Sequence, residues 1–70
     1  MDNLKDVFEK AVLTEANTHL TQDQKNLQLA QLMTAMESRY KIPMLRDEQW
    51  ERENPLIIHI YREISNMRKL

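Results

Sequence analysis

The sequence predicts an all-α fold: a small three-helix bundle in which a helical hairpin packs against a C-terminal helix. Apolar residues recur at intervals of three and four along most of the chain, which is the spacing of one helix face. The 70 residues include no glycine and only two prolines, the two residue types that most disfavour helix interiors. The length is that of one domain, so we expect residues 1–70 to form a single helical domain.

The first helix is predicted over residues 3–16. Asp2 or Asn3 can cap its start, because short polar side chains accept hydrogen bonds from the first turn. Residues 17–19 are indifferent helix formers, and we expect the chain to turn there. The apolar stripe of this helix consists of Leu4, Val7, Phe8, Ala11 and Val12.

The second helix is predicted over residues 22–41. Thr21 and Gln24 have the spacing of a capping box, in which each side chain bonds the backbone of the other residue. Ile42 precedes Pro43, and a residue before proline disfavours the α conformation, so the helix should end there. Its apolar stripe consists of Leu29, Leu32, Met33, Met36 and Tyr40.

Residues 42–54 have no clear periodicity. Asp47 can cap a short extra helical turn over residues 47–53, and the alternative is an irregular loop that would be long for a compact domain. We favour the short helix, and we expect Met44, Leu45 and Trp50 to pack against the main helices.

The last helix is predicted over residues 55–69. Asparagine is a preferred N-cap and proline a preferred first helical residue, so Asn54 and Pro55 indicate its start. The isoleucines would also suit a β-strand, but the three-and-four spacing continues along the segment and favours a helix. The apolar stripe consists of Ile57, Ile60, Tyr61, Ile64 and Met67.

Together these stripes predict the hydrophobic core. Without glycine, the usual left-handed helix ends are not expected, and the helices should end at proline, polar caps or asparagine. The predicted core residues are Leu4, Val7, Phe8, Ala11, Leu29, Leu32, Met33, Met36, Tyr40, Ile57, Ile60, Ile64 and Trp50.

The overall charge disfavours some partner classes. Ten Lys and Arg residues against eleven Asp and Glu residues give a net charge of −1, so bulk attraction to nucleic acid or to an anionic membrane is not expected. No apolar run approaches the ~20 residues of a membrane span. The absence of cysteine excludes disulfides and thiolate zinc sites and fits a cytoplasmic location, which we expect.

The sequence contains no recognisable catalytic, cofactor-binding or metal-binding pattern. His19 and His59 have no second ligand at metal-binding spacing. The acidic residues of segment 47–53 are interleaved with Arg46 and Arg52, so we interpret them as a solvated face. We therefore expect a protein that is not an enzyme and that needs no cofactor or metal.

A few apolar residues lie outside the stripes and are candidates for protein interaction. At about 100° per residue, Leu13 lies opposite Leu4, Leu27 lies opposite Leu29, and Ile58 is off the centre of its stripe. Exposed single apolar residues are common and need no function. Alternatively, they are buried in a homodimer or in the groove of a partner, which the small core of so short a chain favours.

Trp50 is a further candidate within a charged stretch. It either anchors this segment onto the core, which we favour, or is exposed as a binding hot spot.

These features favour a small non-enzymatic protein-interaction or regulatory module that self-associates or binds a larger protein. The alternative is a small DNA-binding regulator that uses Arg62, Arg68 and Lys69 of the basic C-terminal helix. A helix-turn-helix needs a short turn of ~3–4 residues between its helices, whereas here a long connection precedes the last helix. The alternative is therefore less favoured, although the sequence leaves it open.

Overall fold

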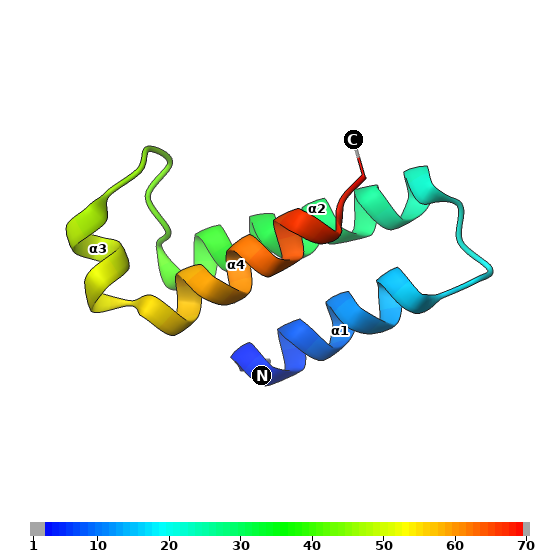
Figure 1. Ribbon diagram of the computed structural model, residues 1–70, viewed down its shortest axis with the longest axis horizontal. Helices are drawn as coiled ribbons and strands as arrows, with labels where there is room; N and C mark the ends of the chain where they lie inside the picture. Colours follow the sequence, from blue (N-terminus) through cyan, green and yellow to red (C-terminus); the bar gives the residue numbers. More distant parts are fainter. Residues whose placement is uncertain (1–2, 70) are drawn as a thin grey trace.

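The computed structural model describes residues 3–69, and the chain is all-α (Figure 1), which confirms the predicted fold class. The described residues form no β-strand. In chain order the helices are α1 (Leu4–Ala16), α2 (Gln22–Tyr40), α3 (Glu48–Glu53) and α4 (Pro55–Met67).

The three longer helices contact one another in pairs. Helices α1, α2 and α4 each pack against the other two, whereas α3 packs against α4. Figure 1 shows that α2 runs in the opposite direction to both α1 and α4. The Cα atoms extend over 39 × 27 × 16 Å, and a helix with its side chains is about 10–12 Å across. The molecule is therefore thin, and few residues can be enclosed on all sides.

Three predicted helix starts have the expected side-chain caps. The Thr21 hydroxyl accepts from the Gln24 N–H at 3.1 Å, and the Gln24 carboxamide accepts from the Thr21 N–H at 2.9 Å, which completes the capping box. Asn3 caps α1 through a single hydrogen bond, in which its Oδ1 accepts from the Asp6 N–H at 2.9 Å. Asp47 caps α3 by accepting from the Trp50 N–H at 3.0 Å. The short helix predicted within segment 42–54 is thus present.

Asn54 occupies the N-cap position of α4, but its side chain forms no hydrogen bond with the first turn of that helix. Instead its Nδ2 donates to the Trp50 carbonyl at 2.9 Å, and its backbone N–H donates to the same oxygen at 2.9 Å. The predicted start of α4 is confirmed, because Asn54 is its N-cap residue and Pro55 its first residue, but the side-chain hydrogen bond typical of an asparagine N-cap is not formed. The reason is that Asn54 also ends α3, and its carboxamide satisfies a carbonyl of that helix.

The end of α2 also differs from the expectation. Lys41 adopts the left-handed conformation, with φ 54° and ψ 46°, although the sequence offers no glycine for such a site. The next residue, Ile42, donates its N–H to the Glu37 carbonyl at 3.1 Å and is buried. A left-handed non-glycine residue costs about 1–2 kcal/mol, and the burial of Ile42 directly after the turn offsets this cost.

We predict that Lys41→Gly stabilises the protein. Glycine removes the steric conflict at the left-handed position but loses more entropy on folding, so the net gain should be about 0.5–1 kcal/mol. Thermal melts followed by circular dichroism measure this gain. Lys41→Ala is the matched control, because it removes the same side chain and keeps the Cβ. If Lys41→Gly melts no higher than Lys41→Ala, the left-handed turn is not strained.

The buried core is smaller than the predicted one. All but one of its members were predicted, and the exception is Ile42, which follows the end of the α2 stripe. Leu4, Phe8, Leu32 and other predicted members are only half-buried, because the thin molecule leaves one side of them near solvent. The buried residues are Val7, Ala11, Leu29, Met33, Met36, Ile42 and Ile64.

The last described residues leave the helix and cross to α2. The Lys69 N–H donates to Asn26 Oδ1 at 3.0 Å, and Asn26 Nδ2 donates to the Lys69 carbonyl at 2.9 Å. These bonds take the place of helical ones, so α4 ends at Met67 rather than at the predicted residue 69.

Candidate functional site

The candidate functional features of this molecule are apolar side chains that lie outside the core. They belong to α1, α2, the loop before α3 and the first turn of α4. The exposed fractions are 40% for Val12, 70% for Leu13, 61% for Leu27, 101% for Met44, 84% for Leu45 and 60% for Leu56.

Leu13 borders two hollows, one formed by α1 alone and one between α1 and α2. The first is almost entirely apolar and is formed by Phe8, Val12 and Leu13, with Glu9 at its edge. The second lies between α1 and α2, where Leu13 and the half-buried Leu32 flank polar residues. The structure therefore places Leu13 beside other apolar side chains, and Phe8, predicted as core, contributes to this outer surface.

Leu27 lies on the solvent-facing side of α2. The helix turns its buried residues, Leu29 and Met33, toward α1 and α4, and Leu27 lies on the opposite face as the sequence predicted. Of its exposed neighbours at helical spacing, Gln24 and Gln31 are uncharged and Asp23 is negatively charged.

The loop before α3 differs from the prediction. Met44 and Leu45 were expected to pack against the main helices, but both are exposed to solvent, and Figure 1 shows this segment projecting beyond the end of α2. The reason is that Ile42 enters the core on one side of the loop and Trp50 packs against it on the other. The residues between them must therefore pass through solvent.

Trp50 and Ile58 line the same hollow beside this loop. Trp50 is half-buried and packs against the core, the position expected of an anchor. Ile58 is half-buried as well, and both residues line a hollow under Met44 and Leu45, together with Tyr61. Two of the four candidate interaction residues are thus brought together here, whereas Leu13 and Leu27 lie elsewhere.

Tyr61 of α4, which lines the same hollow, forms a hydrogen bond with a residue of α2. Its hydroxyl donates a short hydrogen bond to the Glu37 carboxylate. Burial of the phenol, followed by this bond and the negative charge of Glu37, raises the pKa of Tyr61 to about 12, although Arg68 acts in the opposite direction. The hydroxyl therefore keeps its proton, and with it the bond to α2, at neutral pH.

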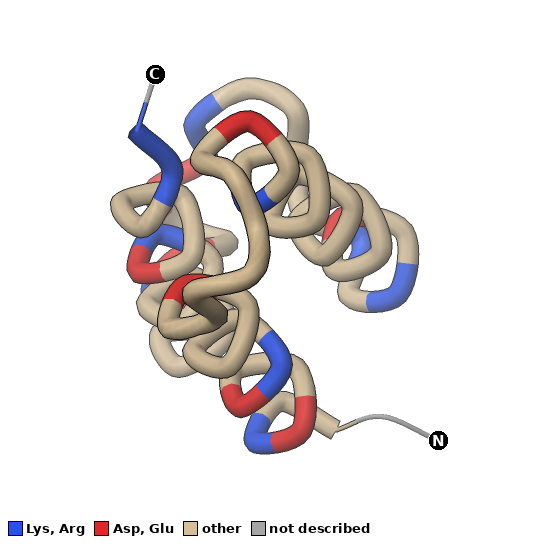
Figure 2. The backbone as a smooth tube through the Cα atoms, turned by 90° about the vertical axis from the view of Figure 1, so that its right-hand side faces the viewer, with Lys and Arg blue, Asp and Glu red and all other residues tan. Residues whose placement is uncertain are grey.

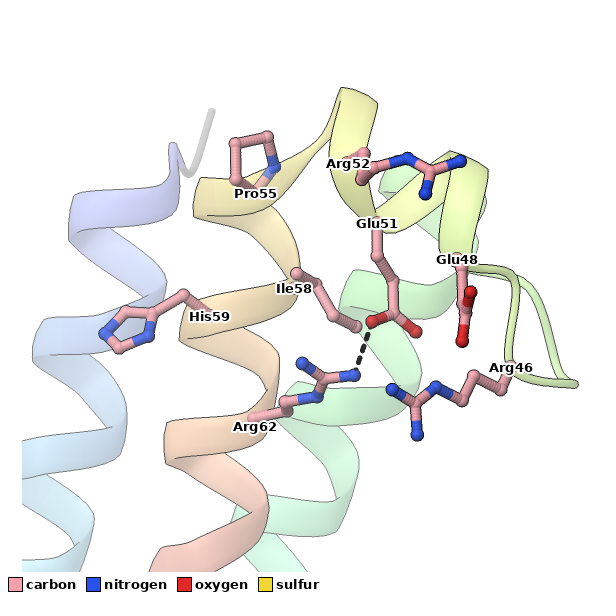
Figure 3. Close-up of a pocket in the computed structure, with 8 residues that line it drawn as sticks. All are labelled: Arg46, Glu48, Glu51, Arg52, Pro55, Ile58, His59 and Arg62. Carbon is pink, nitrogen blue, oxygen red and sulfur yellow. Dashed lines mark hydrogen bonds and ion pairs between the residues drawn. The ribbon is translucent and has the colours of Figure 1, made fainter.

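A further hollow, between α3 and α4, contains charged side chains of both signs. Arg62 and Glu51 form an ion pair at 2.5 Å across it, and Figure 3 shows Arg46 and Glu48 at its rim. His59 of α4 also lines this hollow. Because the charges largely neutralise one another, this hollow has no strong preference for an anion or a cation.

The described residues contain no cluster of three or more His, Asp or Glu side chains that could hold a metal ion. None of the helices in that part of the chain combines the length and the apolar character that crossing a membrane requires.

The basic residues of α4 and its extension are partly engaged within the molecule. Arg62 pairs with Glu51, and the half-buried Arg68 directs its Nη1 to the Met33 sulfur at 3.7 Å. Figure 2 shows positive and negative residues mixed over the helices rather than separated by sign. A DNA-binding face would need clustered cations.

Comparison with protein-family models, curated proteins and solved structures found no match to this chain.

Proposed function

We propose that this chain is a small non-enzymatic interaction module that presents an apolar loop to a larger protein. The observation that carries the proposal is the exposure of two neighbouring large apolar side chains, Met44 and Leu45, 101% and 84% exposed. Single exposed apolar residues are ordinary, but contiguous ones indicate interaction sites. A cytoplasmic location belongs to the same proposal, supported by the absence of cysteine.

The way the loop is held supports this function. Pro43 restricts the backbone before Met44, Ile42 is fixed in the core, and Trp50 holds the far side. A loop fixed at both ends loses less conformational entropy on binding than a mobile one, so more of its burial energy contributes to affinity. Methionine also adapts its shape to the groove that receives it.

We predict that the double substitution Met44→Ser and Leu45→Ser abolishes capture of the larger protein to which the loop is proposed to bind. Full burial of such a side chain is worth about 1.5–3 kcal/mol, so the loss of both should weaken binding by about 100-fold or more. The measurement is affinity capture from a lysate of the host organism, with the tagged wild-type chain and the variant as baits, followed by titration of the captured protein.

Leu27→Ser is the matched control, because it removes an exposed leucine from a different face. A protein captured by the wild type and by Leu27→Ser but lost from the loop variant supports the proposal. If every captured protein binds the loop variant as well as the wild type, the loop is not the docking element. If the wild-type chain instead binds DNA at low salt, the result would favour a nucleic-acid-binding regulator.

A further inference from the structure

The solvent-facing side of α2 carries no charge over most of its length. The exposed residues that form this face are Gln24, Leu27, Gln31, Thr34, Ala35 and Ser38, and we call it the α2 neutral face. Their spacing of three and four keeps them in one line along the helix. Interface centres are depleted in charged residues relative to the rest of a protein surface, and the α2 neutral face has this one feature of a buried contact.

The charges that border the α2 neutral face are arranged by sign. At about 100° per residue, Asp23 and Glu37 lie about 80° and 120° from Gln31 on one side, the side of α4. Arg39 and Lys25 lie about 80° and 120° from it on the other side, that of α1. The helix thus has an acidic edge and a basic edge on either side of an uncharged line.

This arrangement is complementary to itself. When two α2 helices pair in parallel about a twofold axis, the acidic edge of each copy faces the basic edge of the other. Asp23 then lies at the height of Lys25, and Glu37 at the height of Arg39, with offsets of about 3 Å along the axis. In an antiparallel pair the edges of equal sign would meet, which is unfavourable.

The shape of the surface agrees with the charges. Leu27 projects on the acidic side of the line through Gln31, and the hollow bordered by Gln28, Leu32 and Leu13 lies on the basic side. A parallel twofold axis places each Leu27 over the hollow of the other copy at a similar height. An isologous interface requires such reciprocal contacts.

We infer that two copies of this chain pair in parallel through the α2 neutral face. This surface lies on a different element from the Met44–Leu45 loop, so the inference goes beyond the proposed function and does not depend on it. The face is one helix wide and about 22 Å long for 15 residues, which is at the small end for a specific interface. We therefore expect a dissociation constant of roughly tens of micromolar.

The first test is sedimentation equilibrium over a concentration series that extends into the millimolar range. The wild type should change from monomer to dimer, and Gln31→Glu should remain monomeric over that range, because it places equal charges against each other at the axis. Gln31→Lys should behave alike, and mixing the two variants should restore a dimer. Leu45→Glu, which adds the same charge away from α2, is the control and should dimerise normally.

The second test determines whether the two α2 helices pair in parallel or antiparallel. Because the chain has no native cysteine, each introduced cysteine is the only one that can form a disulfide. Single variants Gln24→Cys, Gln31→Cys and Ser38→Cys should each form an intermolecular disulfide, because in a parallel pair each residue on the line meets its own counterpart within the Cα distance of about 4.4–6.8 Å that a disulfide needs. Leu45→Cys is the control without cross-linking.

Two results would overturn the inference. Cross-linking of Gln31→Cys alone would indicate an antiparallel pair, and a wild type that stays monomeric throughout would exclude the dimer. In either event, capture through Met44 and Leu45 would be unaffected, so a failure here is distinct from a failure of the proposed function.

Discussion

Ile64→Asp is expected to prevent folding of the protein. The Ile64 side chain is fully buried, as are Leu29 and Met36 of the same core. A carboxylate in this position would lie among the apolar side chains of the core, and taking a charge out of water costs several kcal/mol even after relaxation. A domain of this size has only about 3–5 kcal/mol of stability, so the substitution should leave the chain unfolded. Far-ultraviolet circular dichroism should show loss of helix at ambient temperature.

A graded control distinguishes the charge from the loss of volume. Ile64→Val removes one methylene from the same place and should cost about 1 kcal/mol, with a cooperative melt at a lower temperature. If Ile64→Asp melts cooperatively near the wild-type temperature, the packing of α4 onto α1 and α2 differs from the one described.

The elements of the fold were predictable because their signals are local. The capping box of Thr21 and Gln24, and the cap at Asp47, each involve residues three apart in the sequence. The apolar stripes likewise depend on helical spacing alone. Such patterns determine where a helix begins and which face it buries, whatever the rest of the chain does.

The structure differs from the prediction where one residue belongs to two helices, or where its conformation depends on packing against distant residues. Asn54 both ends α3 and begins α4, and only the three-dimensional structure decides which helix its side chain serves. Lys41 is left-handed because the burial of Ile42 fixes the direction of the chain. Propensity alone would have placed an asparagine or glycine at that position.

The candidate surfaces were only partly predictable for a related reason. Leu13 and Leu27 were found because an apolar residue opposite a stripe is visible in the sequence. Met44 and Leu45 were missed, because apolar residues in a segment without periodicity have no predicted face. A signal was nevertheless present: two adjacent apolar residues directly after Pro43, in a segment too short to bury them while both of its ends are fixed.

Trp50→Ala is expected to release α3 and the loop while the other helices stay folded. Trp50 is the only apolar residue of the six in α3, and so short a helix is not stable without tertiary contacts. Because Trp50 is half-buried, the cost should be about 2 kcal/mol, below that of a fully buried tryptophan. Hydrogen exchange should show lost amide protection in residues 48–53 and little change in α2.

The same substitution tests how the loop depends on its anchor. Met44 and Leu45 are unchanged in Trp50→Ala, but their loop would be fixed only at Ile42, so binding of the larger protein should weaken through lost preorganisation. Trp50→Phe keeps an aromatic anchor and should retain most of the protection and the binding. If Trp50→Ala weakens binding while residues 48–53 stay protected, Trp50 contacts the partner itself and acts as a hot spot rather than as an anchor.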